Sequence, residues 1–565
     1  MEQTITPTDE RVLQGLRVDE LAGRLMDLPA KQRLDIILNR TDSAAVVAAL
    51  PEQDFYLSVM ELGPDNALPL LALARMPQLN LVFDVQWWRK DQILPARALE
   101  WIERLARASQ HNLVRWLYDV DFSLLVSLFK KWLQVMVVPE DADLLEIRDE
   151  YPLHTLDDQY FWEASYPQYE GLLKSILGFL FEGHYGFYKE LMEHILWAVD
   201  AEMEEEYLRL RRGRLEDLAI PDFHDALEIY RAIRNEEIPL QDKSTMPQYS
   251  QSGESVPNFA MALLAGGGLL DRALRRLQDS PWRTTLQLEL AALANKVVVA
   301  DELVPEESES LQQAVDKAAA MVSLGLDWHT AGDEDLAVIT LERAYLEHLF
   351  RLGHTQVARL RGRLQRLCKS GWLADWPTGI ACLDAPWKEA VELLLAKTPK
   401  VLRVSSEAQR APRADLLRNR QELFRARQTV DTITALNRLH DGLRADVEML
   451  RSKLWQGGQI RLLEDVTLGR LLWTAAANQL WQGHWQVQLL PVNVWAEIYP
   501  HLAPTSVERT IRLWLNQRVS DDAQGNMVLA YLQPLFQAYR EETAAGGLGD
   551  IPDPRYITFF LFSDD

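Results

Sequence analysis

Apolar residues recur along most of the chain with the spacing of amphipathic helices. Between residues 28 and 77 the apolar runs are short, and prolines separate them. Proline fits the first turn of a helix, because its missing N–H has no intrahelical acceptor there. Thr41 and Asp42 can cap the helix that follows them. Helices this short are marginal alone, so the pattern predicts a stack of short helices over residues 1–138.

The next segments predict longer helices around a small β element. Residues 109–138 are strongly apolar and predict buried helices that end before Pro139. After them we expect either a loop or a small hairpin, in which Val137, Leu145 and Ile147 pair with residues 160–162. Helices are expected again from 169 to 218, with a break near residues 183–186, and from 222 to 234.

A polar segment with three prolines, residues 235–257, is the best candidate for a linker. We expect it to separate two lobes. The periodicity after it predicts further helices, over residues 259–278, 281–302, 307–325, 333–353, 355–370 and 384–396.

Residues 413–455 carry the pattern of the longest helix. One apolar stripe is formed by Ile433, Leu436, Leu439, Leu443, Val447, Leu450 and Leu454. A helix of roughly 40 residues spans about 60 Å. We favour a long member of a helix bundle over a bridge between lobes or a coiled coil. Short strands are expected near residues 485–490 and 556–562.

Together these patterns predict a mainly α fold, a two-lobed helical-repeat or superhelical assembly with minor β elements. Five segments are expected along the chain. They are a short-helix superhelical repeat domain (1–138), a helical extension with an acidic cluster (139–234), a linker (235–257), a helical domain (258–400), and a long helix followed by a C-terminal α domain with minor β (401–565).

Three motifs carry a resemblance to a known family: Leu28–Pro29, the run from Thr41 to Glu52, and Leu62–Asp65. Over residues 19–118 the chain resembles the N-terminal superhelical domain of MgtE-type magnesium transporters and, more loosely, the repeats of the flagellar switch protein FliG. In that family acidic residues of the helical domain help to sense magnesium. The comparable positions here are Asp42, Glu52, Asp54 and Asp65. The chain departs from the family in having no transmembrane segment. As a whole it resembles a bacterial domain family of unknown function, of delta-proteobacterial type, which implies no activity.

Composition and charge narrow the class of protein. The 565 residues are 48% hydrophobic and 25% charged, as in soluble globular proteins. The net charge of −24 excludes a generally basic nucleic-acid coat. No apolar run approaches the roughly 20 residues of a membrane span, and the N-terminal residues lack a signal peptide pattern. The two cysteines, Cys368 and Cys382, fit a reducing compartment. We therefore expect a cytoplasmic protein.

The sequence shows no strong catalytic motif. There is no phosphate-binding loop of the GxxxxGK type, no GxSxG, and no HExxH. We therefore assign no catalytic residue and no cofactor, and whether the chain is an enzyme stays open.

An acidic cluster is the candidate metal site. Carboxylates with imidazole can bind a divalent cation, and the candidate ligands are Glu190, His194, Glu202 and Glu205. Glu205 also stands four residues before Arg209, at the spacing of a helical ion pair. We favour a solvated, salt-paired helix face over a metal site.

The charge is distributed unevenly along the chain. Residues 1–250 contain 44 acids and 25 bases, whereas residues 351–461 contain 21 bases and 11 acids. Arginine can bind phosphate or an acidic partner. The candidates are Arg359, Arg361, Arg363, Arg366, Arg418, Arg420, Arg425 and Arg427, and among them Arg359, Arg363, Arg418 and Arg425 are favoured. Intramolecular or solvated roles are favoured over a protein partner, and nucleic acid is the least favoured.

The hypothesis that fits these observations best is a protein-interaction, scaffold or regulatory protein, because stacked short helices offer extended surfaces. Its partner would be another protein, and no membrane insertion is expected. One alternative is a sensor of a divalent cation or small ligand, or an enzyme, with a pocket that no motif marks. Another is nucleic-acid binding through residues 351–461. An exposed apolar patch would favour the first hypothesis.

Overall fold

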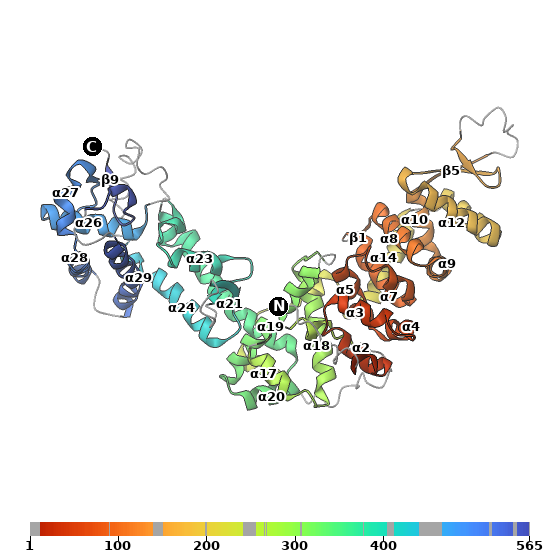
Figure 1. Cartoon of the computed structure of the whole chain (residues 1–565), viewed down its shortest axis with the longest axis horizontal. Helices are drawn as coiled ribbons and strands as arrows, with labels where there is room; N and C mark the ends of the chain where they lie inside the picture. The colour runs from red at the N-terminus through yellow and green to blue at the C-terminus, as the bar shows by residue number, and fades with distance from the viewer. Residues whose placement is uncertain are drawn as a thin grey trace. The chain divides into compact units, whose positions relative to one another are not determined.

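The computed structural model describes residues 12–89, 91–138, 151–197, 200–240, 256–264, 266, 268–304, 308–376, 378–403, 412–439, 466–518, 523–545 and 551–563, without the side chains of 200–204, 308 and 555. Helices dominate this part of the chain and the strands are short, so the mainly α prediction is confirmed (Figure 1). The chain forms two compact units. Unit 1 comprises the chain up to Leu326 and Asp333–Arg351, and unit 2 comprises Asp327–Gly332 and the chain from Leu352 onward.

Unit 1 begins with short helices that pack on one another (Figure 1, red to orange). They are α2 (Val18–Leu25), α3 (Ala30–Leu38), α4 (Ser43–Ala49), α5 (Glu52–Leu62), α6 (Leu68–Leu73), α7 (Met76–Gln86), α8 (Pro95–Ala108), α9 (Gln110–Asp119) and α10 (Phe122–Trp132). Helix α2 packs on α4, α4 on α6 and α6 on α8, while α5 packs on α7. Proline stands at or just before the first turn of α3, α5, α6, α7 and α8. The short helices expected here are therefore confirmed.

A two-stranded hairpin, β1 (Trp88–Arg89) with β2 (Gln92–Ile93), precedes α8, and a three-stranded sheet follows α10. The sheet has the order β3 (Leu133–Val137), β5 (Tyr160–Ala164), β4 (His154–Thr155), and all its pairs are antiparallel. Val137 lies opposite Tyr160, so the expected pairing of these segments is confirmed. The helical prediction for 133–137 is wrong, because hydrogen bonds to β5 hold this segment as a strand. The predicted partners Leu145 and Ile147 lie outside the described residues.

Three longer helices pack beside α10 and the sheet: α12 (Glu170–Gly183), α13 (Tyr185–Trp197) and α14 (Asp200–Asp217). The expected break falls at His184. A buried carboxylate fixes α14 to α7: Asp84 accepts hydrogen bonds from the hydroxyl of Tyr207 and from Nε and Nη2 of Arg214, each at 2.8 Å. The helix expected over 222–234 is shorter, because α15 (Phe223–Leu227) gives way to a 3₁₀ turn at Glu228–Tyr230.

The rest of unit 1 contains α16 (Phe259–Ala262), α17 (Leu269–Arg276), α18 (Trp282–Ala300), α20 (Glu334–Arg343), and the larger part of α19 (Ser308–Thr330). The helix expected over 259–278 is interrupted, and α17 begins after Gly268. Helix α21 (Leu346–Ser370) is continuous where two helices were expected. Segment 235–257 falls within unit 1, and its residues 241–255 lie outside the described part. A role for it as a linker stays a prediction.

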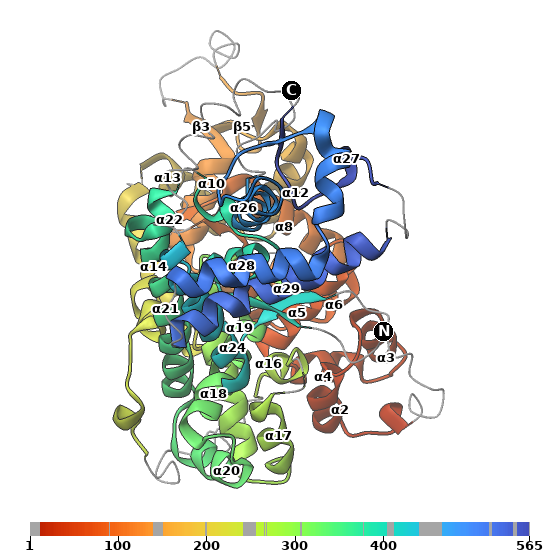
Figure 2. The same ribbon diagram turned by 90° about the vertical axis from the view of Figure 1, so that its left-hand side faces the viewer.

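Unit 2 is a helical bundle with two small strand pairs. It contains the end of α19 and the larger part of α21. Its other elements are α22 (Trp372–Asp375), α23 (Trp387–Leu395), β6 (Lys400–Arg403), β7 (Arg413–Leu416), α24 (Arg420–Ala435), α26 (Leu468–Gln482), β8 (Leu490–Pro491), α27 (Trp495–Ile498), α28 (Pro504–Arg518), α29 (Ala523–Ala545) and β9 (Phe562–Ser563). Figure 2 shows α28 and α29 side by side. The parallel pair β8–β9 lies close to both segments where strands were expected near the C-terminus.

The prediction of one continuous helix over 413–455 is wrong, because α24 begins only at Arg420 and ends at Ala435. Residues 413–416 are β7, which pairs with β6 in an antiparallel hairpin. Helix α24 starts at Arg420, where the side chain of Asn419 caps it by accepting a hydrogen bond from the N–H of Glu422. Ile433 is buried, as the apolar stripe predicts. The last four positions of the stripe lie outside the described residues.

Within the described part of the chain, none of the helices has both the length and the apolar composition that a membrane crossing requires.

Candidate functional site

Six aromatic side chains of unit 1 form a continuous series of ring contacts, which we call the ring series. They come from α9, α10, α12 and α13 and from the α12–α13 turn. Neighbouring ring centroids are 4.9–6.5 Å apart. The series runs in the order Phe179, His184, Tyr118, Phe187, Phe122 and His194.

The ring series lies at the protein surface. Tyr118 is 40% exposed and Phe179 is 38% exposed, and the imidazoles of His184 and His194 are also exposed. Trp197, one helical turn beyond His194 on α13, is 77% exposed. Aromatic rings normally bury most of their area, and contiguous exposed apolar patches mark contact surfaces. This surface is therefore the strongest candidate for a functional site in unit 1.

Two chain reversals bring these rings together. Helix α9 ends just after Tyr118 and α10 begins at Phe122, so both rings lie at one reversal. Helix α12 ends at Gly183, and His184 stands between it and α13, which carries Phe187. In the sequence, the aromatic residues on either side of each reversal are the only signal of the site.

Carboxylates lie beside the rings. Glu190 is three residues after Phe187 and four before His194, which places it on their face of α13. Nδ1 of His194 lies 2.8 Å from the backbone oxygen of Glu190. The hydroxyl of Ser123, next to Phe122 in the sequence, donates a 3.4 Å hydrogen bond to Glu206. No ion pair with another described residue engages the exposed carboxylates of Glu182, Glu190 and Glu205.

The structure only partly gathers the predicted metal ligands. Glu190 and His194 are neighbours on α13, and Glu205 lines an open hollow of about 530 Å³ beside α14. The side chain of Glu202 lies outside the described part. Among the described residues no three or more His, Cys, Asp or Glu side chains form a group that could hold a metal ion. A metal site here stays a prediction.

The predicted arginines have different environments. Arg418 is buried and lies 3.6 Å from Asp415, so it has a structural role in unit 2. Arg359 and Arg425 are exposed, on α21 and α24. Arg363 forms an ion pair with Asp431. These positions do not form one common site.

Of the four acidic residues that the MgtE resemblance singles out, Asp42, Asp54 and Asp65 have hydrogen-bonding partners, and Glu52 is half-buried in the first turn of α5. Asp42 pairs with Arg40 at 2.7 Å, and the hydrogen bond from this guanidinium lowers the pKa of Asp42. Asp65 lies 3.4 Å from Arg104, which lowers its pKa in the same way. Asp54 is fully buried, and burial raises its pKa to about 7. Magnesium sensing by these residues stays a prediction.

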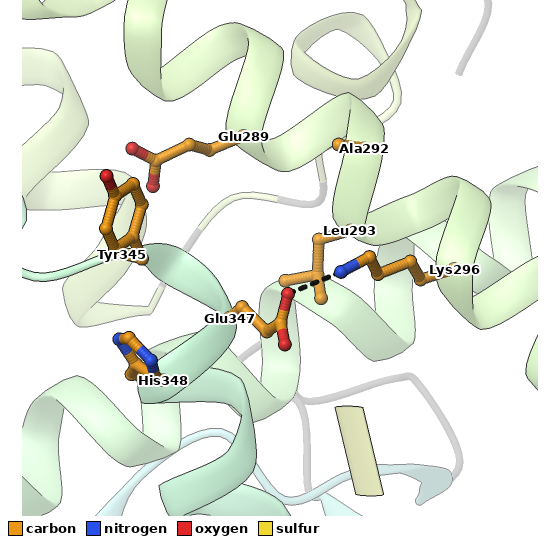
Figure 3. A pocket seen from close by; sticks show the side chains of 7 residues that line it. All are labelled: Glu289, Ala292, Leu293, Lys296, Tyr345, Glu347 and His348. Carbon is orange, nitrogen blue, oxygen red and sulfur yellow. Dashed lines mark hydrogen bonds and ion pairs between the residues drawn. The ribbon is translucent and has the colours of Figure 1, made fainter. Parts of the chain in front are cut away.

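A pocket of about 240 Å³ lies between α18 and the start of α21 (Figure 3). Its lining residues are Glu289, Ala292, Leu293, Lys296, Tyr345, Glu347 and His348. Nζ of Lys296 lies 2.6 Å from Glu347, and Glu289 accepts a 2.8 Å hydrogen bond from the N–H of Leu346. These contacts join the two helices, and two of the three charged side chains neutralise each other. The pocket therefore offers little free charge to a ligand.

A buried carboxylate that the sequence did not reveal organises unit 2. Asp384 accepts hydrogen bonds from the hydroxyl of Tyr531 at 2.8 Å and from the N–H of Gly469 at 2.7 Å. Gly469 lies in the first turn of α26, so the carboxylate anchors this helix start. Burial raises the pKa of Asp384 and of the nearby thiol of Cys382. A thiol with a raised pKa is a poor nucleophile.

Comparison with known proteins places this chain in a family. No curated protein matches it, and no solved structure matches it. The model of one protein family, described as a family of unknown function (DUF6178), matches residues 10–563, which is nearly the whole chain. The chain therefore belongs to this family of unknown function.

Proposed function

We propose that this chain is a protein-interaction protein, with a scaffold or regulatory role, and that a partner binds to the ring series. The observation that carries the proposal is the run of six touching rings on the surface of unit 1, with Tyr118 and Phe179 both more than a third exposed. Covering apolar surface contributes about 25 cal/mol per Å². Aromatic residues are enriched at protein interfaces.

The charge beside the rings favours a basic partner segment. Glu182, Glu190 and Glu205 carry negative charge without an ion pair to the described residues. A lysine or arginine of the partner can pair with these carboxylates and also stack on an exposed ring, at about 0.5–2 kcal/mol for each cation–π contact. We therefore propose a partner segment in which basic residues alternate with apolar ones.

Site-specific photocrosslinking in the source cells tests this proposal. The photoreactive residue p-benzoylphenylalanine replaces Tyr118 or Phe179, and it keeps an aromatic ring at each position. Matched controls carry it at Leu336 or Leu513, which are exposed apolar positions outside the ring series. We expect one protein adduct from positions 118 and 179 and none from the controls. Absence of an adduct at 118 and 179, or equal adducts at all four positions, would overturn the proposal.

Charge reversal tests the chemistry of the partner. Glu190→Lys places a positive charge on the ring face of α13. With about 1 kcal/mol for the lost pairing, we expect about a fivefold lower adduct yield at position 179. Glu389→Lys on α23 is the matched control and should leave the yield unchanged. A yield that Glu190→Lys leaves unchanged would refute a basic partner.

A further inference from the structure

Three arginines of unit 2 lie where α21 and α24 meet, beside the ion pair between Arg363 and Asp431. Arg359 and Arg363 come from α21 and Arg427 comes from α24, and we call them the arginine cluster. Burial lowers the pKa of Arg427, and the positive charges of Arg363 and Arg359 lower it further, while Asp431 opposes this effect. Contacts between the two helices place them: Arg427 reaches Gln356 on α21, and Arg363 reaches Asp431 on α24. Arg359 stands one helical turn before Arg363 on α21. Asp431 forms its ion pair with Arg363.

The position of Arg427 is fixed by two contacts. Its guanidinium lies over the ring of Trp328, 4.8 Å from the centroid, and its Nη2 donates a 2.9 Å hydrogen bond to Gln356. Gln356 stands three residues before Arg359 and seven before Arg363, so all three project from one face of α21. The stack on Trp328 leaves other N–H groups of the planar guanidinium available for a further acceptor.

The arginine cluster carries more positive charge than the described residues neutralise. Among the described residues, the ion pair of Arg363 with Asp431 is the only one that these three cations make, which leaves an excess of about two charges. Arg359 is exposed, and no hydrogen bond or ion pair joins its side chain to another described residue. Like charges held this close repel one another. A bound dianion would remove that repulsion.

We propose that the arginine cluster binds the phosphoryl group of a small phosphorylated molecule. A phosphate monoester carries a charge of about −1.5 to −2 at neutral pH, together with three strong acceptor oxygens. Its charge therefore matches the excess on the cluster, and its oxygens match the fork of each guanidinium.

A small ligand fits this site better than nucleic acid does. Binding to a nucleic-acid backbone needs cations distributed along several phosphates, whereas this cluster is compact and the whole chain has a net charge of −24. Phe424 lies three residues before Arg427 on α24 and is 59% exposed. It can cover an apolar group attached to the phosphate, which favours an organic monoester over inorganic phosphate.

Calorimetric titration of the full chain tests the proposal, with inorganic phosphate and phenyl phosphate as the two probes. At about pH 8 the monoester is a dianion. We expect both probes to bind at low salt, with phenyl phosphate the tighter of the two. Tighter or equal binding of inorganic phosphate would assign the site to free phosphate and refute the contact with Phe424. At a probe concentration of about 10 mM, binding with a Kd in the millimolar range is still detectable. The proposal would be overturned if neither probe gave binding heat at that concentration.

Variants assign the binding to the cluster. Arg359→Ala removes an exposed side chain that holds nothing in place, so it should fold normally and lose about tenfold in affinity. Arg425→Ala on α24 is the matched control, because Arg425 is exposed but outside the cluster; its affinity should not change. Equal losses in both variants would refute a specific site. Binding of single-stranded RNA without binding of either phosphate probe would replace the proposal with a nucleic-acid surface.

Discussion

The buried carboxylate of Asp54 gives unit 1 a specific dependence on pH. Asp54 lies on α5, is 1% exposed, and accepts hydrogen bonds of 2.8–2.9 Å from the backbone N–H groups of Asn258 and Phe259. Burial raises its pKa from 3.8 to about 7, although the two amides and the positive charge of Arg33 act in the opposite direction. In the unfolded chain the same group has a pKa of about 3.9.

The sign and size of the effect follow from these two pKa values. Between them the folded chain holds a proton that the unfolded chain has lost, so the free energy of unfolding falls as the pH rises through this window. One pKa unit corresponds to about 1.4 kcal/mol. From pH 5 to pH 8 the stability of unit 1 should therefore fall by about 2.5 kcal/mol from this group, with little change at higher pH.

The predicted loss of stability is measured against the variant Asp54→Asn, whose side chain has the same shape but cannot ionise. Chemical denaturation of both proteins from about pH 5 to pH 8 gives the difference in their free energies of unfolding, from which the other titrating groups cancel. Hydrogen exchange at the amides of Asn258 and Phe259 locates the effect in unit 1. Between pH 5 and pH 8 the free energy of unfolding of the wild type should fall by about 2.5 kcal/mol relative to that of the variant. A difference that is constant or that grows in favour of the wild type as the pH rises would refute the reasoning.

Three further predictions concern single side chains. Asp84→Ala leaves the buried end of Arg214 without its carboxylate and should destabilise unit 1 by about 3 kcal/mol in chemical denaturation; a loss below about 1 kcal/mol would contradict this role. Gly469→Ala would place a Cβ 2.6 Å from Oδ1 of Asp384, so we expect unit 2 to melt at lower temperature, and an unchanged transition would argue against this contact. Asp42 has a lowered pKa, so its stabilisation is present above about pH 4 and is lost as the pH falls below that value. The wild type should therefore be more stable than Asp42→Asn near neutral pH, and this difference in the free energy of unfolding should shrink on acidification. A difference that persists at low pH would refute the prediction.

The sequence predicts the helical elements well where the signal is local. Proline positions and apolar spacing act within a few residues, and they indicated the short helices of residues 18–132 and the break at His184. The predicted cap did not form, because Asp42 stands at the N-cap of α4 but its carboxylate bonds to Arg40 instead. Where a strand forms, the same signals failed. Residues 133–137 and 413–416 have helical sequence patterns. The first segment pairs with residues 23 or more positions away in the chain, and the second pairs with residues 10 to 16 positions away. A pattern that one segment carries cannot report such a partner.

The candidate sites also depend on residues that are far apart in the sequence, which local patterns do not bring together. The sequence named eight arginines and favoured four of them. The structure shows that the favoured Arg418 is buried, whereas Arg427, which was not among the four, lies with Arg359 and Arg363 where α21 and α24 meet. The sequence also noted carboxylates near residue 190, but it did not indicate that Tyr118 and His184, 66 residues apart, place their ring centroids 4.9 Å from each other.

By itself the sequence determined the mainly α class, the short helices of the N-terminal region and the excess of negative charge, because each of these depends on composition or on neighbours along the chain. Only the tertiary structure decided which polar groups are buried and which charges meet. Burial inside unit 1 raises the pKa of Asp54 to about 7, although the hydrogen bonds from the N–H groups of residues 258 and 259 act in the opposite direction. Arg427 belongs to a charged cluster because α24 lies beside α21. Desolvation and Coulomb interactions depend on distance in space, and that distance is set by packing between segments far apart in the sequence.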